Sequence, residues 1–319
     1  MYKIDKLKEA FFLSDSVNAA CAWHPRSNGN TAFEKKFTTG ELPIEPNRYR
    51  LVWGRFCPWA TPVAILIDLM GLDKVISKAA IYDLRHAGID DDWFFGAGDH
   101  DQDPVLKTSR LSENYRKTDP DFNERPTIPA LVDVTTGKVV STSSDELMNE
   151  LSTAWQAYFA PDAPDIFPND QSEAILEMNH FIVDDLTAIP GQISSVTSQA
   201  AYEKLYQQYF DRLDWLEGRL SNNRFLLGDK LTQPDIRLFV DLVRFDAVFY
   251  FKDKLNKQRL DDYPNLWRYA RDCYQIPAFR NNTDFQAIKA HFFKISDNPV
   301  DSLDRVMPLG PDENRWSAY

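Results

Sequence analysis

Cysteine is scarce in this sequence. Only three occur among 319 residues, and they lie far apart, at Cys21, Cys57 and Cys273. They form no CxxC pair and no group with metal-ligand spacing, and an odd number favours a reducing compartment. The five histidines are equally dispersed, and a lone histidine is more often structural than a ligand. We therefore predict that the protein binds no metal.

Other absences exclude further classes of protein. No glycine-rich phosphate loop and no GxSxG motif occurs in the sequence. The formal net charge of −12 and the pI of about 4.9 argue against a nucleic acid or an anionic membrane as partner. The start, "MYKIDKLKEAFF", lacks the apolar core of a signal peptide, and the longest apolar run is interrupted by Asp68. These features predict a soluble, cytoplasmic protein.

One cysteine lies at the junction of two patterns in "YRLVWGRFCPWATPVAILIDLMGL", residues 49–72. The residues before Cys57 alternate as in a strand, and apolar residues after it recur at helical spacing, which predicts a helix over 58–72. Pro58 suits the first turn of such a helix, where a missing N–H costs nothing. Position alone leaves two alternatives for Cys57, a reactive thiol whose pKa the helix N-terminus lowers or a buried apolar filler.

The pattern over residues 47–158 predicts a thioredoxin-like domain. A strand, a helix and a second strand over 75–83 are followed by a long acidic insertion, in which Asp90, Asp91 and Asp92 are expected on the solvated surface. The segments "PALVDV", "TTGK" and "VVST" then predict a hairpin, and a helix begins near Asp145. We interpret residues 1–46 as an N-terminal extension over this domain.

The period changes to that of helices after residues 159–171, a linker rich in proline and aspartate. Residues 172–295 predict an all-helical domain, and residues 296–319 form a C-terminal tail. Within the helical domain Thr232 and Asp235 have the spacing of a capping box, with Leu231 and Ile236 as its hydrophobic staple. The predicted fold class is therefore an α/β thioredoxin-like domain followed by an all-α domain.

The order of these domains and several separate motifs carry a family resemblance. "CPWA", Trp93, "YRKTDPDFNERPTIPALVD", "RFLLGDKLTQPDIRLFVDLVRFDAVF", "LDDYPNLWRYARDCYQIP" and "MPLGP" together span about residues 49–311. This set resembles the glutathionyl-hydroquinone reductases, the omega-like Xi class of the glutathione transferases. The resemblance implies the glutathione transferase fold, glutathione as co-substrate, a homodimer and Cys57 as the catalytic nucleophile.

The resemblance also assigns a glutathione-binding site. It implies that Ile128-Pro129 is a cis-proline turn whose backbone binds glutathione, that Arg125 pairs with a carboxylate, and that Trp93 borders the ligand. A solvated loop charge is the alternative for Arg125. Where the family has Glu-Ser for the γ-glutamyl group, this chain has Ser143-Ser144, which we expect to bind glutathione. Ser144 and the N–H groups at that helix start would bind a carboxylate, and Asp145 is the alternative to the family glutamate as partner of the amino group. An N-cap role is the alternative for Ser143.

The acceptor pocket departs from the family pattern. Three family tyrosines fall near Gly191, on Phe249, and within the run that contains Phe292 and Phe293. Phenylalanine keeps the stacking face but loses the hydroxyl donor, which predicts a weaker grip on a phenolic oxygen.

We therefore predict an enzyme that removes glutathione from S-glutathionyl conjugates such as glutathionyl-hydroquinones, through a mixed disulfide on Cys57. Its partners would be glutathione and an aromatic or other S-glutathionyl acceptor. Two alternatives stay open: the same chemistry with a different small thiol, and a binding protein of this fold that has no activity.

Overall fold

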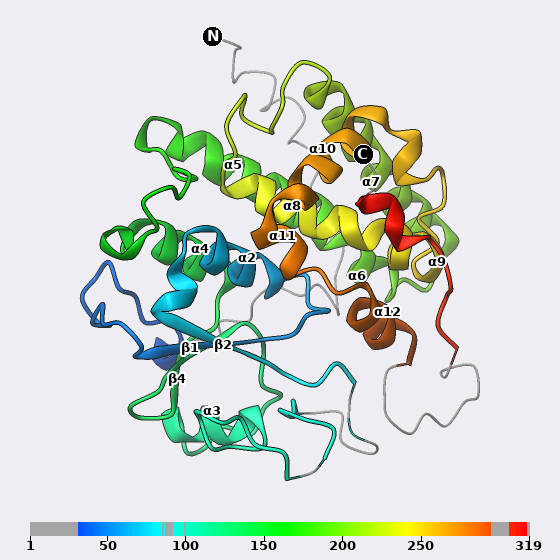
Figure 1. The fold of residues 1–319 in the computed structure, drawn as a ribbon. Coiled ribbons are helices and arrows are strands. Elements are labelled where there is room, and N and C mark those ends of the chain that lie inside the picture. The colour runs from blue at the N-terminus through cyan, green and yellow to red at the C-terminus, as the bar shows by residue number, and fades with distance from the viewer. Residues whose placement is uncertain (1–30, 85, 87–91, 99, 295–305, 318–319) are drawn as a thin grey trace.

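The computed structural model describes residues 31–84, 86, 92–98, 100–294 and 306–317. A small sheet with its helices lies below a larger group of helices in Figure 1. The N-terminal part contains four strands and three α-helices in the described residues: β1 (Tyr49–Trp53), α2 (Thr61–Leu69), β2 (Ile76–Ala80), α3 (Leu111–Thr118), β3 (Ala130–Asp133), β4 (Lys138–Ser141) and α4 (Ser144–Thr153).

The sheet has the strand order β2-β1-β3-β4. β2 runs parallel to β1, and β3 is antiparallel to both β1 and β4, so the predicted hairpin is present. All five residues of β1 are buried, including Arg50, whose guanidinium forms an ion pair with Asp103 at 2.7 Å. Helices α2 and α4 pack against each other on one side of the sheet, and α3 lies on the other (Figure 1).

Helix α2 is shorter than the predicted range of 58–72 at both ends. The N–H of Thr61 donates to the carbonyl of Cys57 as in a helix, but Pro62 has no N–H with which to continue the series. The regular helix therefore begins at Thr61. It ends at Leu69 because Gly71 adopts a left-handed conformation with φ of 73°.

The C-terminal part is helical, as predicted. Helix α8 lies at its centre and is buried along its whole length. Its capping box between Thr232 and Asp235 is formed as predicted. Because α8 packs against α2 as well as against α5 and α10, it joins the two domains (Figure 1). The α-helices here are α5 (Ser172–Ile182), α6 (Ile189–Ile193), α7 (Gln199–Leu220), α8 (Gln233–Arg244), α9 (Tyr250–Lys252), α10 (Pro264–Gln275), α11 (Pro277–Asn281) and α12 (Phe285–Lys294), with π-helical turns at Val183–Thr187 and Phe245–Phe249.

Both described terminal segments pack onto the domains. In residues 31–46, Phe33, Phe37 and Leu42 are buried, and the Glu150 carboxylate accepts hydrogen bonds from the N–H groups of Phe37 and Thr38. In residues 306–317, Trp316 is buried against α8, α10 and α12. The rest of the predicted extension, with Cys21, and residues 296–305 of the predicted tail lie outside the described residues.

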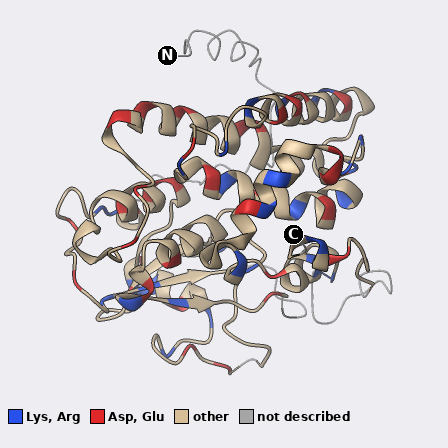
Figure 2. Ribbon diagram, turned by 45° about the horizontal axis from the view of Figure 1, so that its top comes forward, with Lys and Arg blue, Asp and Glu red and all other residues tan. Residues whose placement is uncertain are grey.

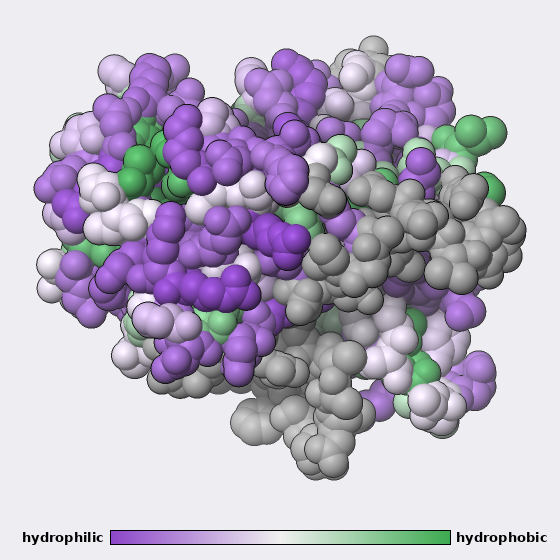
Figure 3. All heavy atoms as spheres, turned by 90° about the horizontal axis from the view of Figure 1, so that it is seen from below, coloured by the Kyte–Doolittle hydropathy of each residue, from purple (hydrophilic) through white to green (hydrophobic). Residues whose placement is uncertain are grey.

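The described surface is mostly polar. Acidic and basic residues are interspersed over the helices in Figure 2, and the face shown in Figure 3 is largely hydrophilic with small, separate apolar areas. Within the described ranges no helix is both long and apolar enough to cross a bilayer.

Candidate active site

Cys57 lies in the turn between β1 and α2. Only 7% of the residue is exposed, and its Sγ lies 3.9 Å from the carbonyl oxygen of Ile128. The Thr61 hydroxyl donates to the Cys57 carbonyl at 2.8 Å, and the Cys57 N–H donates to the Gly54 carbonyl at 3.0 Å. The thiol is therefore held between the start of α2 and the loop that precedes β3.

The pKa of the Cys57 thiol is raised, contrary to the lowering expected from a helix N-terminus. Burial is the largest cause, because the thiolate loses its hydration. The backbone N–H groups of Ala60 and Trp59 lower the pKa, and the charges of Arg244 and Arg125 lower it to a smaller extent. The sequence indicated the N–H groups but not how deeply the thiol is buried, and burial has the larger effect on its pKa.

The Ile128-Pro129 peptide bond is cis, in agreement with the predicted turn. Trp93 is buried, and its indole N–H donates to the Pro126 carbonyl at 3.0 Å. The Arg125 guanidinium lies 4.8 Å from the centre of a Trp93 ring. The structure thus brings Trp93, Arg125 and the cis-proline turn together, and Ile128 connects them to Cys57.

Asp92 is buried, so its predicted place on the solvated surface is wrong. Its carboxylate accepts hydrogen bonds from the N–H groups of Trp93, at 2.8 Å, and Ser112, at 3.1 Å. Asp92 therefore fixes the backbone at Trp93 against the start of α3. Asp90 and Asp91 lie outside the described residues.

The two serines at the start of α4 have different contacts. Ser143 is the N-cap and accepts from the Glu146 N–H at 3.2 Å. The buried Ser144 donates from its hydroxyl to the Trp59 carbonyl at 2.7 Å, which ties α4 to the CPWA motif. Asp145 forms an ion pair with Arg237 of α8 at 2.6 Å, so this carboxylate already has a cationic partner.

The phenylalanines assigned to the acceptor pocket come from two helical segments. Phe249 ends the π-helical turn after α8, and its ring meets that of Phe292 on α12 edge to face, with centroids 6.5 Å apart. Phe249 is buried, whereas Phe292 and Phe293 are half-buried. The structure brings Phe249 and Phe292 into contact, and Phe293 follows on the same helix.

Histidine 291 links α12 to the cysteine loop, a contact that the sequence did not predict. Its ring stacks on Phe56 with a centroid distance of 3.6 Å and an angle of 8°, and lies 6.0 Å from Trp93. Its Nδ1 lies 3.1 Å from the Asp83 carbonyl oxygen. Because Phe56 precedes Cys57, this stack places the helix that carries Phe292 beside the thiol loop.

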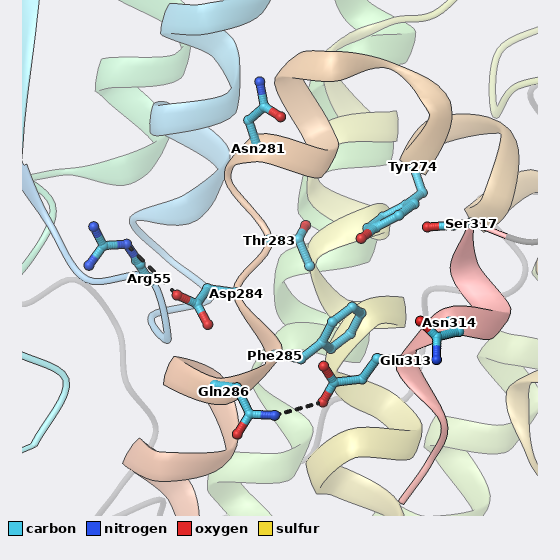
Figure 4. A pocket seen from close by; sticks show the side chains of 10 residues that line it. All are labelled: Arg55, Tyr274, Asn281, Thr283, Asp284, Phe285, Gln286, Glu313, Asn314 and Ser317. Atoms are coloured by element: carbon cyan, nitrogen blue, oxygen red, sulfur yellow. Dashed lines mark hydrogen bonds and ion pairs between the residues drawn. The ribbon is translucent and has the colours of Figure 1, made fainter.

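Two clefts open beside Arg55, two residues before Cys57. One, of about 390 Å³, lies between the cysteine loop, the start of α12 and the C-terminal segment (Figure 4). It is polar, with Arg55 and Asp284 4.0 Å apart and Gln286 donating to Glu313 at 3.2 Å. The other, of about 380 Å³, follows the edge strand β2. Nowhere in the described part of the chain do three or more metal-binding side chains meet.

Comparisons with known proteins identify the family. Residues 199–272 match the family model described as glutathione S-transferase, C-terminal domain. The chain is 34% identical to glutathionyl-hydroquinone reductase YqjG of Escherichia coli over 258 residues, which cover 80% of this chain and 77% of the relative. It is 33% identical over 297 residues to glutathionyl-hydroquinone reductase PcpF of Sphingobium chlorophenolicum, covering 91% and 93%.

Solved structures give the same result. A glutathione transferase from Gordonia bronchialis superposes with a TM-score of 0.82 at 34% identity, over 89% of this chain and 87% of the other. The glutathione-bound structure of YqjG superposes with a TM-score of 0.76 at 32% identity, over 85% and 87%. The predicted fold class is confirmed, and the relatives support a glutathione-dependent activity. The chain belongs to the glutathionyl-hydroquinone reductase family, the Xi class of the glutathione transferases.

Proposed function

We propose that this protein removes glutathione from S-glutathionyl conjugates, glutathionyl-hydroquinones among them, by thiol chemistry at Cys57. The observation that carries the proposal is the setting of this thiol. It lies beside the cis-proline turn. Burial raises the pKa of the thiol, while the N–H groups of Ala60 and Trp59 and the charges of Arg244 and Arg125 act in the opposite direction and favour the thiolate.

The reaction would proceed in two steps. The Cys57 thiolate attacks the glutathione sulfur of the conjugate, an S–S bond forms, and the carbon–sulfur bond breaks. The released electron pair and a proton go to the ring carbon, which leaves as part of the hydroquinone. A second glutathione thiolate then attacks the mixed disulfide, which releases Cys57 and forms glutathione disulfide.

We assign the second step to an external thiol because no second cysteine lies beside Cys57 in the described residues. Cys273 is fully buried on α10 in the helical domain, and Cys21 lies outside the described residues. Burial raises the pKa of Cys273 well above its ordinary value. We therefore assign resolution of the mixed disulfide to free glutathione, and we place the enzyme in a compartment that holds reduced glutathione, the cytoplasm.

We assign glutathione to the surface formed by Trp93, Arg125, the Ile128-Pro129 turn and the N-terminus of α4 at Ser143-Ser144. The Arg125 guanidinium would pair with a glutathione carboxylate, and the N–H groups at the start of α4 would bind the other end of the tripeptide. The aromatic acceptor would lie against Phe249, Phe292 and Phe293. We further propose a homodimer, which analytical ultracentrifugation at micromolar concentration would test.

The phenylalanines that we assign to the acceptor favour a wider choice of substrates than hydroquinones. Phe249 and Phe292 offer ring faces and edges but no hydroxyl group, so an acceptor that needs no phenolic hydrogen bond would fit equally well. S-glutathionyl conjugates of other aromatic groups are the class to compare with glutathionyl-hydroquinones.

The test is turnover of a glutathionyl-hydroquinone with free glutathione, with the intact mass of the protein followed in parallel. We expect wild type to release hydroquinone and to carry a glutathione adduct, whereas Cys57→Ser does neither. Cys273→Ala, the matched control, should retain turnover. An adduct without turnover would leave the thiol chemistry standing with a different acceptor. The absence of both the adduct and turnover would refute the proposed mechanism. It would favour a different thiol or a binding protein.

A further inference from the structure

Arg244, the last residue of α8, is a fully buried cation. Its guanidinium donates to backbone carbonyls and one hydroxyl, and no carboxylate of the described residues lies within ion-pair distance of it. Its Nη1 donates to the Val240 carbonyl at 2.7 Å, while Nε and Nη2 both donate to the Phe56 carbonyl at 3.1 Å. A buried charge without an ionic partner is costly, so its position requires an explanation.

The partners of Arg244 lie on both sides of the thiol. Besides the Phe56 carbonyl, Nη2 reaches the Arg55 carbonyl at 3.3 Å and the Thr61 hydroxyl oxygen at 3.1 Å. The same Thr61 hydroxyl donates to the Cys57 carbonyl. One side chain of the helical domain therefore holds the last two residues before Cys57 and the first residue of α2.

Two groups can offset the Arg244 charge. Burial lowers the pKa of Arg244 to about 10. The charge of Cys57 and, to a smaller extent, that of Asp241 act in the opposite direction. Asp241 lies one turn earlier on α8 and accepts a hydrogen bond from the Thr187 hydroxyl at 2.6 Å. Burial raises the pKa of Asp241 to about 7, so near neutral pH it supplies only part of a negative charge. The Cys57 thiolate would supply the rest.

We propose that Arg244 is a positioning residue of the thiol site: it fixes the loop that carries Cys57 and provides the buried positive charge that stabilises the thiolate. The proposal rests on the proposed function only in taking Cys57 as the reactive thiol. Arg125 is the other cation that acts on Cys57, from the loop before the cis-proline turn. Arg244 differs from it in being fully buried and in donating hydrogen bonds to the loop that carries Cys57.

The experiment measures the rate of Cys57 alkylation by iodoacetamide between pH 6 and pH 10 in the full chain, with peptides resolved by mass spectrometry. An opposite charge nearby lowers a pKa by about one to three. We therefore expect Arg244→Gln to slow alkylation at pH 7 by about tenfold or more and to move the profile to higher pH. Arg244→Lys keeps the charge and should retain most of the rate. Arg219→Gln, which removes another arginine bound to a backbone carbonyl, should leave the profile unchanged.

Cys273 is an internal monitor of folding, because its complete burial protects it from iodoacetamide in the native chain. If Cys273 is alkylated in Arg244→Gln, that variant is not natively folded, and the proposal is tested with Asp241→Asn instead. This variant keeps an oxygen acceptor for Thr187 but removes the charge that competes for Arg244. Asp241 also faces the buried Arg237 of α8, whose ion pair with Asp145 the variant leaves in place. The variant should accelerate Cys57 alkylation by about threefold at pH 8 and have no effect at pH 6.

A folded Arg244→Gln protein with the wild-type profile would overturn the proposal, and so would an Asp241→Asn profile that is unchanged at pH 8. Iodoacetamide needs no glutathione site, so the outcome is independent of turnover. If the alkylation shifts occur but no glutathionyl conjugate is processed, the role of Arg244 stands and the proposed function fails.

Discussion

Replacing Asp235 by alanine should destabilise the helical domain by an amount that depends on pH. This fully buried carboxylate accepts hydrogen bonds from the N–H groups of Leu226, at 2.9 Å, and Thr232, at 2.8 Å. It also accepts from the hydroxyls of Thr232 and Tyr269, both at 3.0 Å. The hydroxyls can turn to other partners, but the two backbone N–H groups cannot. At about 1–3 kcal/mol for each buried group left without a partner, we expect a loss of about 2–6 kcal/mol at pH 4.

The sign of the pH dependence follows from the raised pKa of Asp235. Burial, opposed by the hydrogen bonds, raises this pKa from 3.8 to about 6. A group with a raised pKa in the folded state stabilises fully below its unfolded pKa and loses that contribution as the pH rises through the folded value. This rise in pKa corresponds to about 3 kcal/mol in the free energy of unfolding. Only the wild type loses this stability between about pH 4 and pH 7, because the variant has no carboxyl group at position 235. The gap between wild type and Asp235→Ala should therefore narrow over this range.

Urea unfolding followed by far-ultraviolet circular dichroism at pH 4 and pH 7 would measure both effects. Asp229→Ala, at an exposed aspartate in the loop before α8, is the control and should change the free energy of unfolding by less than about 0.5 kcal/mol. A gap that grows from pH 4 to pH 7 would mean that the native state favours the ionised carboxylate, and would refute the reasoning.

Three further predictions concern the acceptor pocket and the terminal segments. Phe249→Tyr would add a hydroxyl beside Phe292 and should raise kcat/KM for a glutathionyl-hydroquinone by about fivefold. Alkylation of Cys57 should not change. A decrease in kcat/KM would show that the added hydroxyl has no hydrogen-bond partner there. Glu150→Gln should weaken the hydrogen bonds from the N–H groups of residues 37 and 38 and lower the free energy of unfolding in urea by about 1–3 kcal/mol. Proteolysis within residues 31–46 should become faster, and unchanged cleavage would contradict this prediction. Lys289→Met removes the buried cation of an ion pair with the half-exposed Glu313 at 2.8 Å. It should cost about 1–3 kcal/mol and expose residues 306–317 to limited proteolysis. Equal protection in the variant would argue that Trp316 alone holds the segment.

The elements predicted best from the sequence depend on contacts between near neighbours. The strand at 49–53, the hairpin over 130–141 and the capping box of α8 are all present. Each depends on alternation, turn residues or hydrogen bonds within a few positions of the chain. The start of α2 was predicted three residues early, because the pattern after Cys57 shows apolar spacing but not how Pro62 interrupts the first turn.

The environment of the thiol could not be predicted in this way. The sequence places Cys57 before a helix, yet burial raises its pKa against the N–H groups that favour the thiolate. Asp92 lies in a run of acidic residues typical of surface, yet it is buried and holds Trp93. Both outcomes depend on which distant segments cover the residue, and no local pattern carries that information.

The sequence by itself determined the order of the two domains, the position of Cys57 between strand and helix, and the motifs that place the chain in its family. Only the tertiary structure decided that Arg244 of α8 holds the cysteine loop, that His291 of α12 stacks on Phe56, and that Asp145 is already paired with Arg237. Local structure follows from the side chains and hydrogen bonds of adjacent residues. Charge, burial and pKa follow from packing between helices that are far apart in the chain.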